Sequence, residues 1–311
     1  MTKVFIDGRE GTTGLRIEER LRGREGIELI AIDADKRKDP DARRECINAA
    51  DVVFLCLPDA AAREAVALAE GSRAVIIDAS TAHRTEPGWA YGFAELSARH
   101  RRAIAGGKRI AVPGCHASGF IALVYPLIAA GVMGADYPVV CHSVTGYSGG
   151  GKKMIAQYQA DGREAELSSP RQYGLSQRHK HLKEMQAVCG LDSAPVFMPV
   201  VADFYSGMVV TVPVFTGLLK KRMDLNALGA LFEAHYAGQK LVRVLPMDES
   251  VLYLGANNLA GRDSMEIFIT GNDERALLTA RFDNLGKGAS GAAVQCLNIV
   301  LGLEEDAGLA V

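Results

Sequence analysis

The sequence lacks any apolar run of the roughly 18–20 residues that a membrane-spanning helix needs. It also lacks an excess of one charge, because 35 lysines and arginines face 37 aspartates and glutamates, for a net charge of −2. We therefore expect neither a nucleic acid nor a membrane surface as a partner. The six cysteines form no CxxC pair, which favours reduced thiols in a cytoplasmic protein. The N-terminus opens directly into a strand-like run, so no signal peptide is expected.

The chain of 311 residues, 48% of them hydrophobic, is long enough for two cores. Its first third contains short, continuous apolar runs separated by helical patterns, including one through Leu15, Ile17 and Leu21. The expected strands are 3–7, 27–33, 51–57 and 74–78. Continuous runs indicate strands that are covered on both faces. The pattern predicts a Rossmann-type α/β domain with a doubly wound parallel sheet.

After residue 115, β-branched runs follow one another without a helix between every pair. They lie at 137–143, 196–201, 208–215, 242–245, 265–269 and 277–282. This favours a second, α+β domain with a mixed or antiparallel sheet. The alanine-rich stretch 288–303 is expected to be a buried helix. We predict one domain from 1–115 plus 284–311 and a second from 116–283.

Three glycines, Gly8, Gly11 and Gly14, stand between the first strand and the first helix. Glycines there let the backbone approach a pyrophosphate, whose charge then lies at the helix N-terminus. Thr12 and Thr13 add hydroxyl donors. The spacing is GxxGxxG instead of GxGxxG, and a tight turn without a ligand is the alternative.

Basic residues follow the second strand. Lys36 and Arg37 are placed to accept the extra phosphate of NADP, whereas an acidic residue there would favour NAD. A solvated basic loop is the alternative.

Cys115 follows a Pro113-Gly114 turn and precedes an apolar helical pattern. At a helix N-terminus the dipole favours a thiolate, which is the form that attacks an acyl carbon. The alternative is a small buried cysteine, as in most cores. That alternative is preferred for Cys46, Cys56, Cys141, Cys189 and Cys296, which lie in apolar runs or lack such a turn.

A second cluster contains His179, His181 and Glu184. Histidines beside a carboxylate are suited to general acid/base catalysis or to metal binding. No third ligand with a typical spacing is evident, so no metal is expected. Surface histidines beside lysines are the alternative.

Seven segments together resemble the N-acetyl-γ-glutamyl-phosphate reductases in their shorter form. They are 5–14 (FIDGREGTTG), 54–59 (FLCLPD), 78–84 (DASTAHR), 113–118 (PGCHAS), 145–152 (TGYSGGGK), 179–184 (HKHLKE) and 284–291 (NLGKGASG). They run in family order along essentially the whole chain. The cysteine turn and segment 284–291 together make the resemblance specific.

The resemblance implies an enzyme of arginine biosynthesis that reduces an acyl phosphate with NADP(H). Cys115 would expel inorganic phosphate and form a thioester, which is reduced to N-acetylglutamate 5-semialdehyde. His179 would be the acid/base, with His181 and Glu184 nearby. Lys183 stands where the family often has proline, and His181 remains an alternative acid/base.

The same resemblance implies that Arg84 contacts the substrate. In the 146–152 loop, the backbone amides together with Ser148 and Lys152 would form a nest for the leaving phosphate. The family also forms dimers or tetramers, so a homo-oligomer is expected. For these residues the alternatives are a surface arginine and a flexible loop.

Ser80 and Thr81 are expected to border the nicotinamide, and Asn284 to touch its amide. A turn that caps the last helix is the alternative for Asn284.

Two other functions remain possible. One is a related semialdehyde dehydrogenase, such as the aspartate enzyme, because residue types alone do not identify the acyl group. The other is an NADP sensor without catalysis, for which a reactive Cys115 would have no use.

Overall fold

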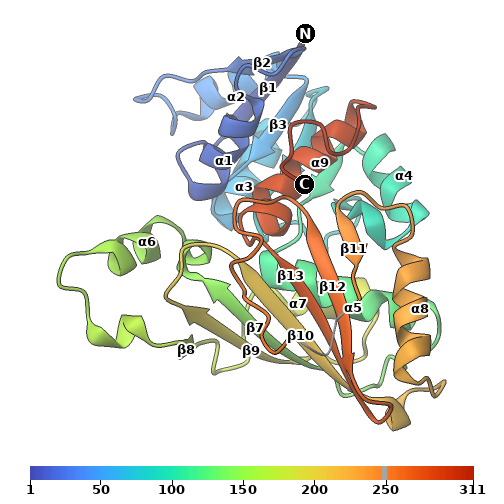
Figure 1. Ribbon diagram of the computed structural model, residues 1–311. Helices are drawn as coiled ribbons and strands as arrows, with labels where there is room; N and C mark the ends of the chain where they lie inside the picture. The colour runs from blue at the N-terminus through green and yellow to red at the C-terminus, as the bar shows by residue number, and fades with distance from the viewer. Residues whose placement is uncertain (247–250) are drawn as a thin grey trace. The chain divides into compact units, whose positions relative to one another are not determined.

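The computed structural model describes residues 1–246 and 251–311, and this part of the chain divides into two compact units. The first unit contains Met1–Gly114 and Ala289–Leu309, and the second contains Cys115–Gly288 and Ala310–Val311. Cys115 is therefore the first residue of the second unit, and the chain re-enters the first unit at Ala289 instead of at residue 284. Each unit has its own sheet (Figure 1).

The sheet of the first unit has, within the described residues, six parallel strands in the order β2-β1-β3-β4-β6-β5. They are β1 (Thr2–Asp7), β2 (Ile27–Ile30), β3 (Val52–Leu55), β4 (Val75–Asp78), β5 (Ala90–Tyr91) and β6 (Arg109–Ala111). The helices are α1 (Thr12–Leu21), α2 (Pro40–Ala49), α3 (Asp59–Leu68), α4 (Ala98–Gly106) and α9 (Gly291–Val300), with the short η1 (Ala94–Leu96). The predicted doubly wound parallel sheet is confirmed.

Both faces of this sheet are covered, and alternate residues of β1 point to opposite sides. Val4 and Ile6 join a core with residues of α1, α4 and α9, whereas Phe5 packs with residues of α2 and α3. Because α9 is buried over nearly its whole length, the expected buried helix at 288–303 is confirmed, although the α-helix is shorter.

Two sequence expectations for the first unit were wrong in detail, and two short strands were not predicted. The second strand ends at Ile30 instead of residue 33, and a turn follows it. Leu15, expected on the apolar face of α1, is 43% exposed. The short strands β5 and β6 were missed, because two or three residues give no readable periodicity.

The sheet of the second unit is mixed, with seven strands in the described residues in the order β11-β12-β13-β10-β7-β9-β8. They are β7 (Val140–Gly146), β8 (Arg171–Gln172), β9 (Val196–Ala202), β10 (Met208–Phe215), β11 (Val242–Val244), β12 (Met265–Gly271) and β13 (Arg275–Phe282). Two pairs are parallel, β7 with β9 and β11 with β12, and the others are antiparallel. The predicted α+β architecture is confirmed.

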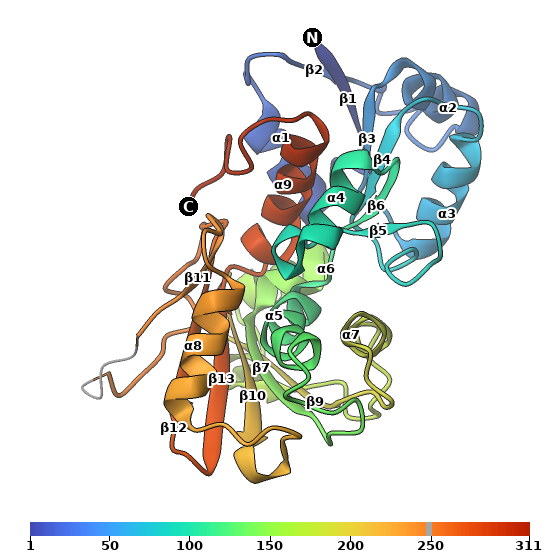
Figure 2. The ribbon, with the colours of Figure 1, turned by 90° about the vertical axis from the view of Figure 1, so that its right-hand side faces the viewer.

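One face of this second sheet carries the long helix α5 (Cys115–Ala129), which contacts β10, β13 and α7 (Figure 2). Gly119 allows its close approach, since a Cβ there would lie 2.5 Å from a methyl group of Val210. The remaining helices are α6 (Gly151–Gln159), α7 (Leu182–Cys189) and α8 (Leu225–His235). Short turns are η2 (Tyr147–Gly150), η3 (Ala165–Ser168), η4 (Thr216–Leu218) and the π-helical η5 (Gly286–Ser290).

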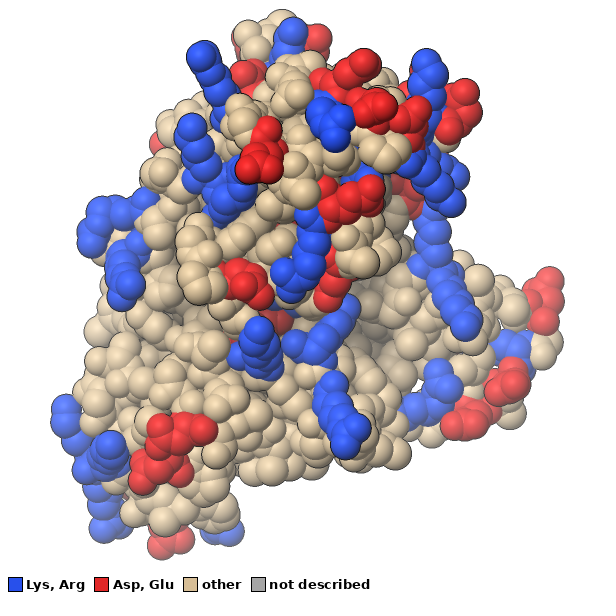
Figure 3. All heavy atoms as spheres, turned by 180° about the vertical axis from the view of Figure 1, so that it is seen from behind, with Lys and Arg blue, Asp and Glu red and all other residues tan. Residues whose placement is uncertain are grey.

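Acidic and basic side chains are interspersed on the face shown in Figure 3, as expected from the near balance of charges. Within the described ranges, no helix is long and apolar enough to cross a membrane.

Candidate active site

The glycine turn lies at the carboxyl end of β1, between β1 and α1. Gly8 has φ +83°, and a Cβ there would lie 2.4 Å from the carbonyl oxygen of Cys56, just after β3. A Cβ on Gly14 would lie 2.6 Å from Cα of Arg9. Because the chain leaves β1 toward β2 while β3 lies on its other side, this turn marks the point where strand order reverses. Ligands of open α/β sheets bind at such points.

The amides at the start of α1 fit a phosphate. Gly11 is the N-cap, and among the described residues no side chain caps this end of the helix. The first amides of a helix lack intrahelical partners, and the dipole there favours an anion. Thr12 and Thr13, the first two residues of α1, therefore lie where a pyrophosphate would bind.

The two basic residues that were expected to select NADP are exposed in the turn after β2. Arg37 forms an ion pair with Glu10 of the glycine turn, and Lys36 lies 3.7 Å from Asp33. Arg37 is thus held beside the glycine turn. Its role toward a ligand phosphate stays a prediction.

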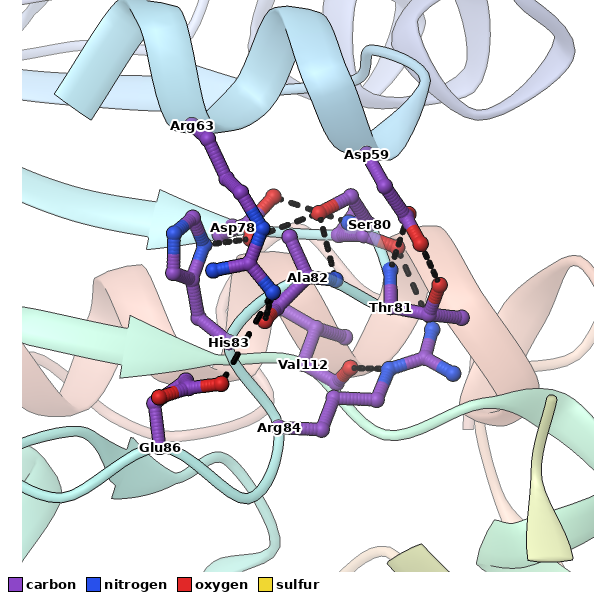
Figure 4. Close-up of polar contacts among 11 residues, drawn as sticks. Asp59, Arg63, Asp78, Ser80, Thr81, Ala82, His83, Arg84, Glu86 and Val112 are labelled. Atoms are coloured by element: carbon purple, nitrogen blue, oxygen red, sulfur yellow. Dashed lines mark hydrogen bonds and ion pairs between the residues drawn. The ribbon is translucent and has the colours of Figure 1, made fainter. Parts of the chain in front are cut away.

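The loop after β4 is organised by one buried carboxylate, Asp78 (Figure 4). It accepts hydrogen bonds from the Ser80 amide at 2.8 Å and from the Ser80 hydroxyl at 2.7 Å. His83 Nδ1 lies 2.6 Å from the same carboxylate, and its ring stacks on Trp89 with centroids 4.2 Å apart. Thr81 is held separately, because its amide and hydroxyl both donate to Asp59 at the start of α3.

Arg84 ends this loop and is half-buried. Its Nε donates to the carbonyl of Val112 at 2.9 Å and its Nη2 to that of Ala79 at 3.2 Å. Arg84 therefore fixes its own loop against the chain after β6, and its role in substrate binding stays a prediction.

Cys115 is the first residue of α5 and is partly exposed, in agreement with the expected position at a helix N-terminus. Cys46 and Cys56 are also partly exposed, so the expectation that they are buried was wrong, whereas Cys141, Cys189 and Cys296 are buried as expected. Burial raises the pKa of Cys46, Cys56, Cys141 and Cys189.

The two histidines of the second cluster lie just before α7 and differ in exposure. The amide of His181 donates to Nδ1 of His179 at 3.2 Å, so a neutral His179 ring carries its proton on Nε2. His181 is buried, and its Nε2 lies 4.0 Å from the buried carboxylate of Glu184. The ring centroids of the two histidines are 4.7 Å apart.

Sequence reasoning missed three residues beside this cluster. His116, which directly follows Cys115, is 5.6 Å from both His179 and His181 between ring centroids. Its ring nitrogens contact Ser143 and Tyr173. In the sequence, the only sign of this arrangement is the histidine that directly follows Cys115.

The expected amide nest at 146–152 is only partly present. The amides of Gly146, Tyr147 and Ser148 donate to carbonyls of residues 204–207, so they cannot also hold a phosphate. Ser148 is buried, and its hydroxyl accepts a bond from Asn284. Lys152 lies in the first turn of α6, whose amides remain the candidate anion contact.

Asn284 is buried inside the second unit. Its Oδ1 accepts from the Gly207 amide at 2.9 Å, and its Nδ2 donates to Ser148 at 3.0 Å. It therefore joins two loops of this unit, and the expected contact with a nicotinamide amide stays a prediction.

The described residues contain no group of three or more histidine, cysteine, aspartate or glutamate side chains arranged to bind a metal ion.

Residues 3–104 match the model of the semialdehyde dehydrogenase NAD binding domain, and residues 115–284 match that of the semialdehyde dehydrogenase dimerisation domain. The chain is 46% identical over 318 aligned residues to N-acetyl-gamma-glutamyl-phosphate reductase 2 of Nostoc, covering 99% of both chains. It is 47% identical to N-acetyl-gamma-glutamyl-phosphate reductase of Brucella ovis, covering 96% of this chain and 99% of the other.

Among solved structures, the fold is similar to aspartate semialdehyde dehydrogenase II of Vibrio cholerae, with a TM-score of 0.74 and 14% identity over 97% of this chain and 98% of the other. The aspartate semialdehyde dehydrogenase of Francisella tularensis gives a TM-score of 0.73 at 15% identity, over 97% and 100%. At this identity the similarity concerns the fold alone.

Proposed function

We propose that this chain, which belongs to the N-acetyl-γ-glutamyl-phosphate reductase family of semialdehyde dehydrogenases, reduces N-acetyl-γ-glutamyl phosphate with NADPH to N-acetylglutamate 5-semialdehyde and phosphate. It is an oxidoreductase of arginine biosynthesis. The observation that carries the proposal is the position of Cys115, a partly exposed thiol at the start of α5 in the unit that also holds His179 and His181.

In the first step the Cys115 thiolate attacks the acyl carbon of the substrate. A carbon–sulfur bond forms, the bond from that carbon to the phosphate oxygen breaks, and phosphate leaves with its electron pair. The N-terminus of α5 favours the thiolate that this step needs. Arg84, Lys152 and the first turn of α6 are the groups proposed to bind the anionic substrate and the phosphate, and Ser148 contributes by holding the loop.

NADPH, when bound, supplies the hydride that reduces the thioester carbonyl. His179, in its protonated form, then gives the Nε2 proton to the resulting oxygen and becomes neutral. In the last step this proton returns to His179, the carbonyl group re-forms, the carbon–sulfur bond breaks, the aldehyde leaves and Cys115 is again a thiolate. His181 and Glu184 are proposed to position His179.

The cofactor is NADP(H), and the residues at its proposed site fit it. The uncapped start of α1 suits the pyrophosphate, and Arg37 with Lys36 suits the additional phosphate. Ser80 and Thr81 are proposed to border the nicotinamide, held in place by Asp78 and Asp59. Asn284 is proposed as a further cofactor contact.

A second copy of this chain is the proposed partner. The face of the second sheet opposite α5 is partly exposed, because alternate residues of β9, β10 and β13 point away from the core, and it carries apolar side chains among polar ones. On it Val196 is 54%, Phe215 58% and Leu277 44% exposed. All six cysteines lie in described residues and are free thiols, which supports the expected reducing, cytoplasmic compartment.

The test is the reverse reaction. With N-acetylglutamate semialdehyde and NADP⁺, we expect NADPH to appear only when phosphate is added. Cys115→Ser should abolish this while NADPH still binds, and Cys46→Ser, which changes another partly exposed thiol, should leave turnover near normal. Near-normal turnover in Cys115→Ser would refute the covalent route. A preference for aspartate semialdehyde would favour the related enzyme, and no turnover with either would favour a sensor.

A further inference from the structure

His83 is buried in the loop 79–84 after β4, between a carboxylate and an aromatic ring. Its Nδ1 lies 2.6 Å from Oδ2 of Asp78, the last residue of β4 (Figure 4). Its ring stacks on Trp89, with an angle of 10° between the two ring planes. The proposed reaction does not use this histidine, although it lies beyond the carboxyl end of a parallel strand, where ligands of such sheets bind.

Asp78 is a completely buried carboxylate, so its oxygens need hydrogen-bond donors. Oδ1 accepts from the amide of Ser80 at 2.8 Å, and Oδ2 accepts from the hydroxyl of Ser80 at 2.7 Å. An ionised carboxylate can only accept, so Nδ1 of His83 carries a hydrogen and donates it to Oδ2. His83 and the Ser80 hydroxyl are therefore bonded to the same oxygen atom.

Ser80 connects this carboxylate to the rest of the loop. Its hydroxyl donates to Asp78 and accepts a bond from the amide of Ala82 at 3.1 Å. The carbonyl of Ala82 in turn accepts a bond from Arg63 of α3 at 2.7 Å. The path from His83 through Asp78 to Ser80 thus consists of two short hydrogen bonds between buried groups.

Loss of the His83 donor would loosen this path. Among the described residues, Oδ2 of Asp78 would keep only the Ser80 hydroxyl as a donor, and a buried carboxylate that lacks a donor is costly. The carboxylate and Ser80 would then turn toward other donors, so that a smaller fraction of molecules holds the loop in its present conformation. The affinity for a ligand that needs this conformation falls in proportion to that fraction.

We propose that His83 is a positioning residue for the nicotinamide half of NADP(H). It acts through Asp78, which fixes Ser80 in the loop that is proposed to border the nicotinamide. The phosphates of the cofactor are proposed to bind elsewhere, at the start of α1 and at Arg37 with Lys36, so His83 should not affect them. The inference rests on the proposed function, because the ligand and the place of its nicotinamide come from there.

The test compares two ligands by isothermal titration calorimetry. One is NADPH, and the other is 2′-phospho-ADP-ribose, which is the same molecule without the nicotinamide. His83→Phe keeps a ring beside Trp89 but removes the donor to Asp78. It should weaken the binding of NADPH about tenfold, as expected for the loss of one hydrogen bond to a charged group. The affinity for 2′-phospho-ADP-ribose should stay unchanged, whereas a general loss of structure would weaken both ligands.

His83→Asn should restore most of the NADPH affinity, because the asparagine amide can place an N–H donor near the position of Nδ1. His100→Phe is the matched control and should change neither affinity. His100 is another histidine of the first unit whose Nδ1 is bonded, at 2.8 Å to the Ser97 hydroxyl, and it lies in α4 without a proposed ligand role. The emission of Trp89, the one tryptophan of the sequence, checks that the loop stays folded.

An unchanged NADPH affinity in His83→Phe would overturn the proposal. Equal weakening of both ligands would also overturn it, because His83 would then only stabilise the fold. If His83→Phe is too unstable to titrate, Ser80→Ala is the second variant: it removes the hydroxyl through which His83 acts, and the absence of a selective loss there would overturn the proposal as well. Failure of the unaltered chain to bind NADPH would instead contradict the proposed function, and this inference with it.

Discussion

The guanidinium of Arg43 donates two hydrogen bonds to one carboxylate oxygen of Asp7, at 3.0 Å and 2.9 Å, and both side chains are almost completely buried. Asp7 is the last residue of β1, directly before the glycine turn, and Arg43 lies in α2. This pair ties α2 to the end of β1.

Arg43→Met should therefore leave a buried carboxylate without its partner, at a cost of about 3–5 kcal/mol of unfolding free energy at pH 7. Burial already raises the pKa of Asp7 while Arg43 lowers it, so the variant raises that pKa further. A raised folded-state pKa favours the protonated folded protein, so the destabilisation should shrink as the pH falls toward about 5. Urea denaturation at both pH values checks this. A double variant with Asp7→Asn should regain most of the loss, and no regain would contradict the pairing.

The conformation of Gly8 predicts that Gly8→Ala prevents NADPH binding and lowers stability. Its φ is positive, and the added Cβ would overlap the Cys56 carbonyl. Gly26→Ala is the control, since Gly26 has φ +80° and a Cβ added there would meet no atom within 4 Å, so it should cost only about 1 kcal/mol. Fluorescence titration with NADPH and denaturation measure both effects. Equal losses of NADPH affinity and of stability in the two variants would show that the overlap with the Cys56 carbonyl is unimportant.

Arg84→Lys should raise the KM for phosphate in the reverse reaction about tenfold, because lysine cannot bind an anion through a planar pair of donors. The KM for NADP⁺ should change little. Arg63→Lys is the matched control, as Arg63 also donates to this loop, at the Ala82 carbonyl at 2.7 Å, without an assigned ligand role. A similar rise in both variants would mean that Arg84 acts only by holding the loop.

His179→Asn should lower kcat by about 100-fold or more, as expected for loss of a general acid/base. His181→Asn should have a smaller effect, because the bond that fixes the His179 ring comes from the backbone amide of residue 181, which the substitution keeps. The pH dependence of kcat in each variant provides the measurement. The reverse order of effects would assign the proton to His181.

Much of the local structure could be predicted from the sequence. The continuous apolar runs predicted the parallel sheet, because strands covered on both faces need apolar residues throughout. The Pro-Gly turn before Cys115 and the apolar residues after it placed that thiol at a helix N-terminus. These features depend on residues close together in the chain.

The short strands β5 and β8 were not predictable, since two residues pair only because a neighbouring strand is already in place. The phosphate nest expected from the amides of the 146–152 loop was wrong in part for a related reason. Their acceptors lie in residues 204–207, and no local pattern shows that these carbonyls face the loop.

The sequence by itself determined the position of Cys115 at a helix N-terminus, the glycine turn and the two fold classes, because each depends on backbone and side-chain preferences within a few residues. The tertiary structure alone decided the surroundings of Cys115. Ser143 is 27 residues from His116 and Tyr173 is 57 residues from it, so their meeting depends on how strands β7, β8 and β9 pair and where α5 packs. Hydrogen-bond partners at such separations follow from the register of the sheet, which no single segment of the chain specifies.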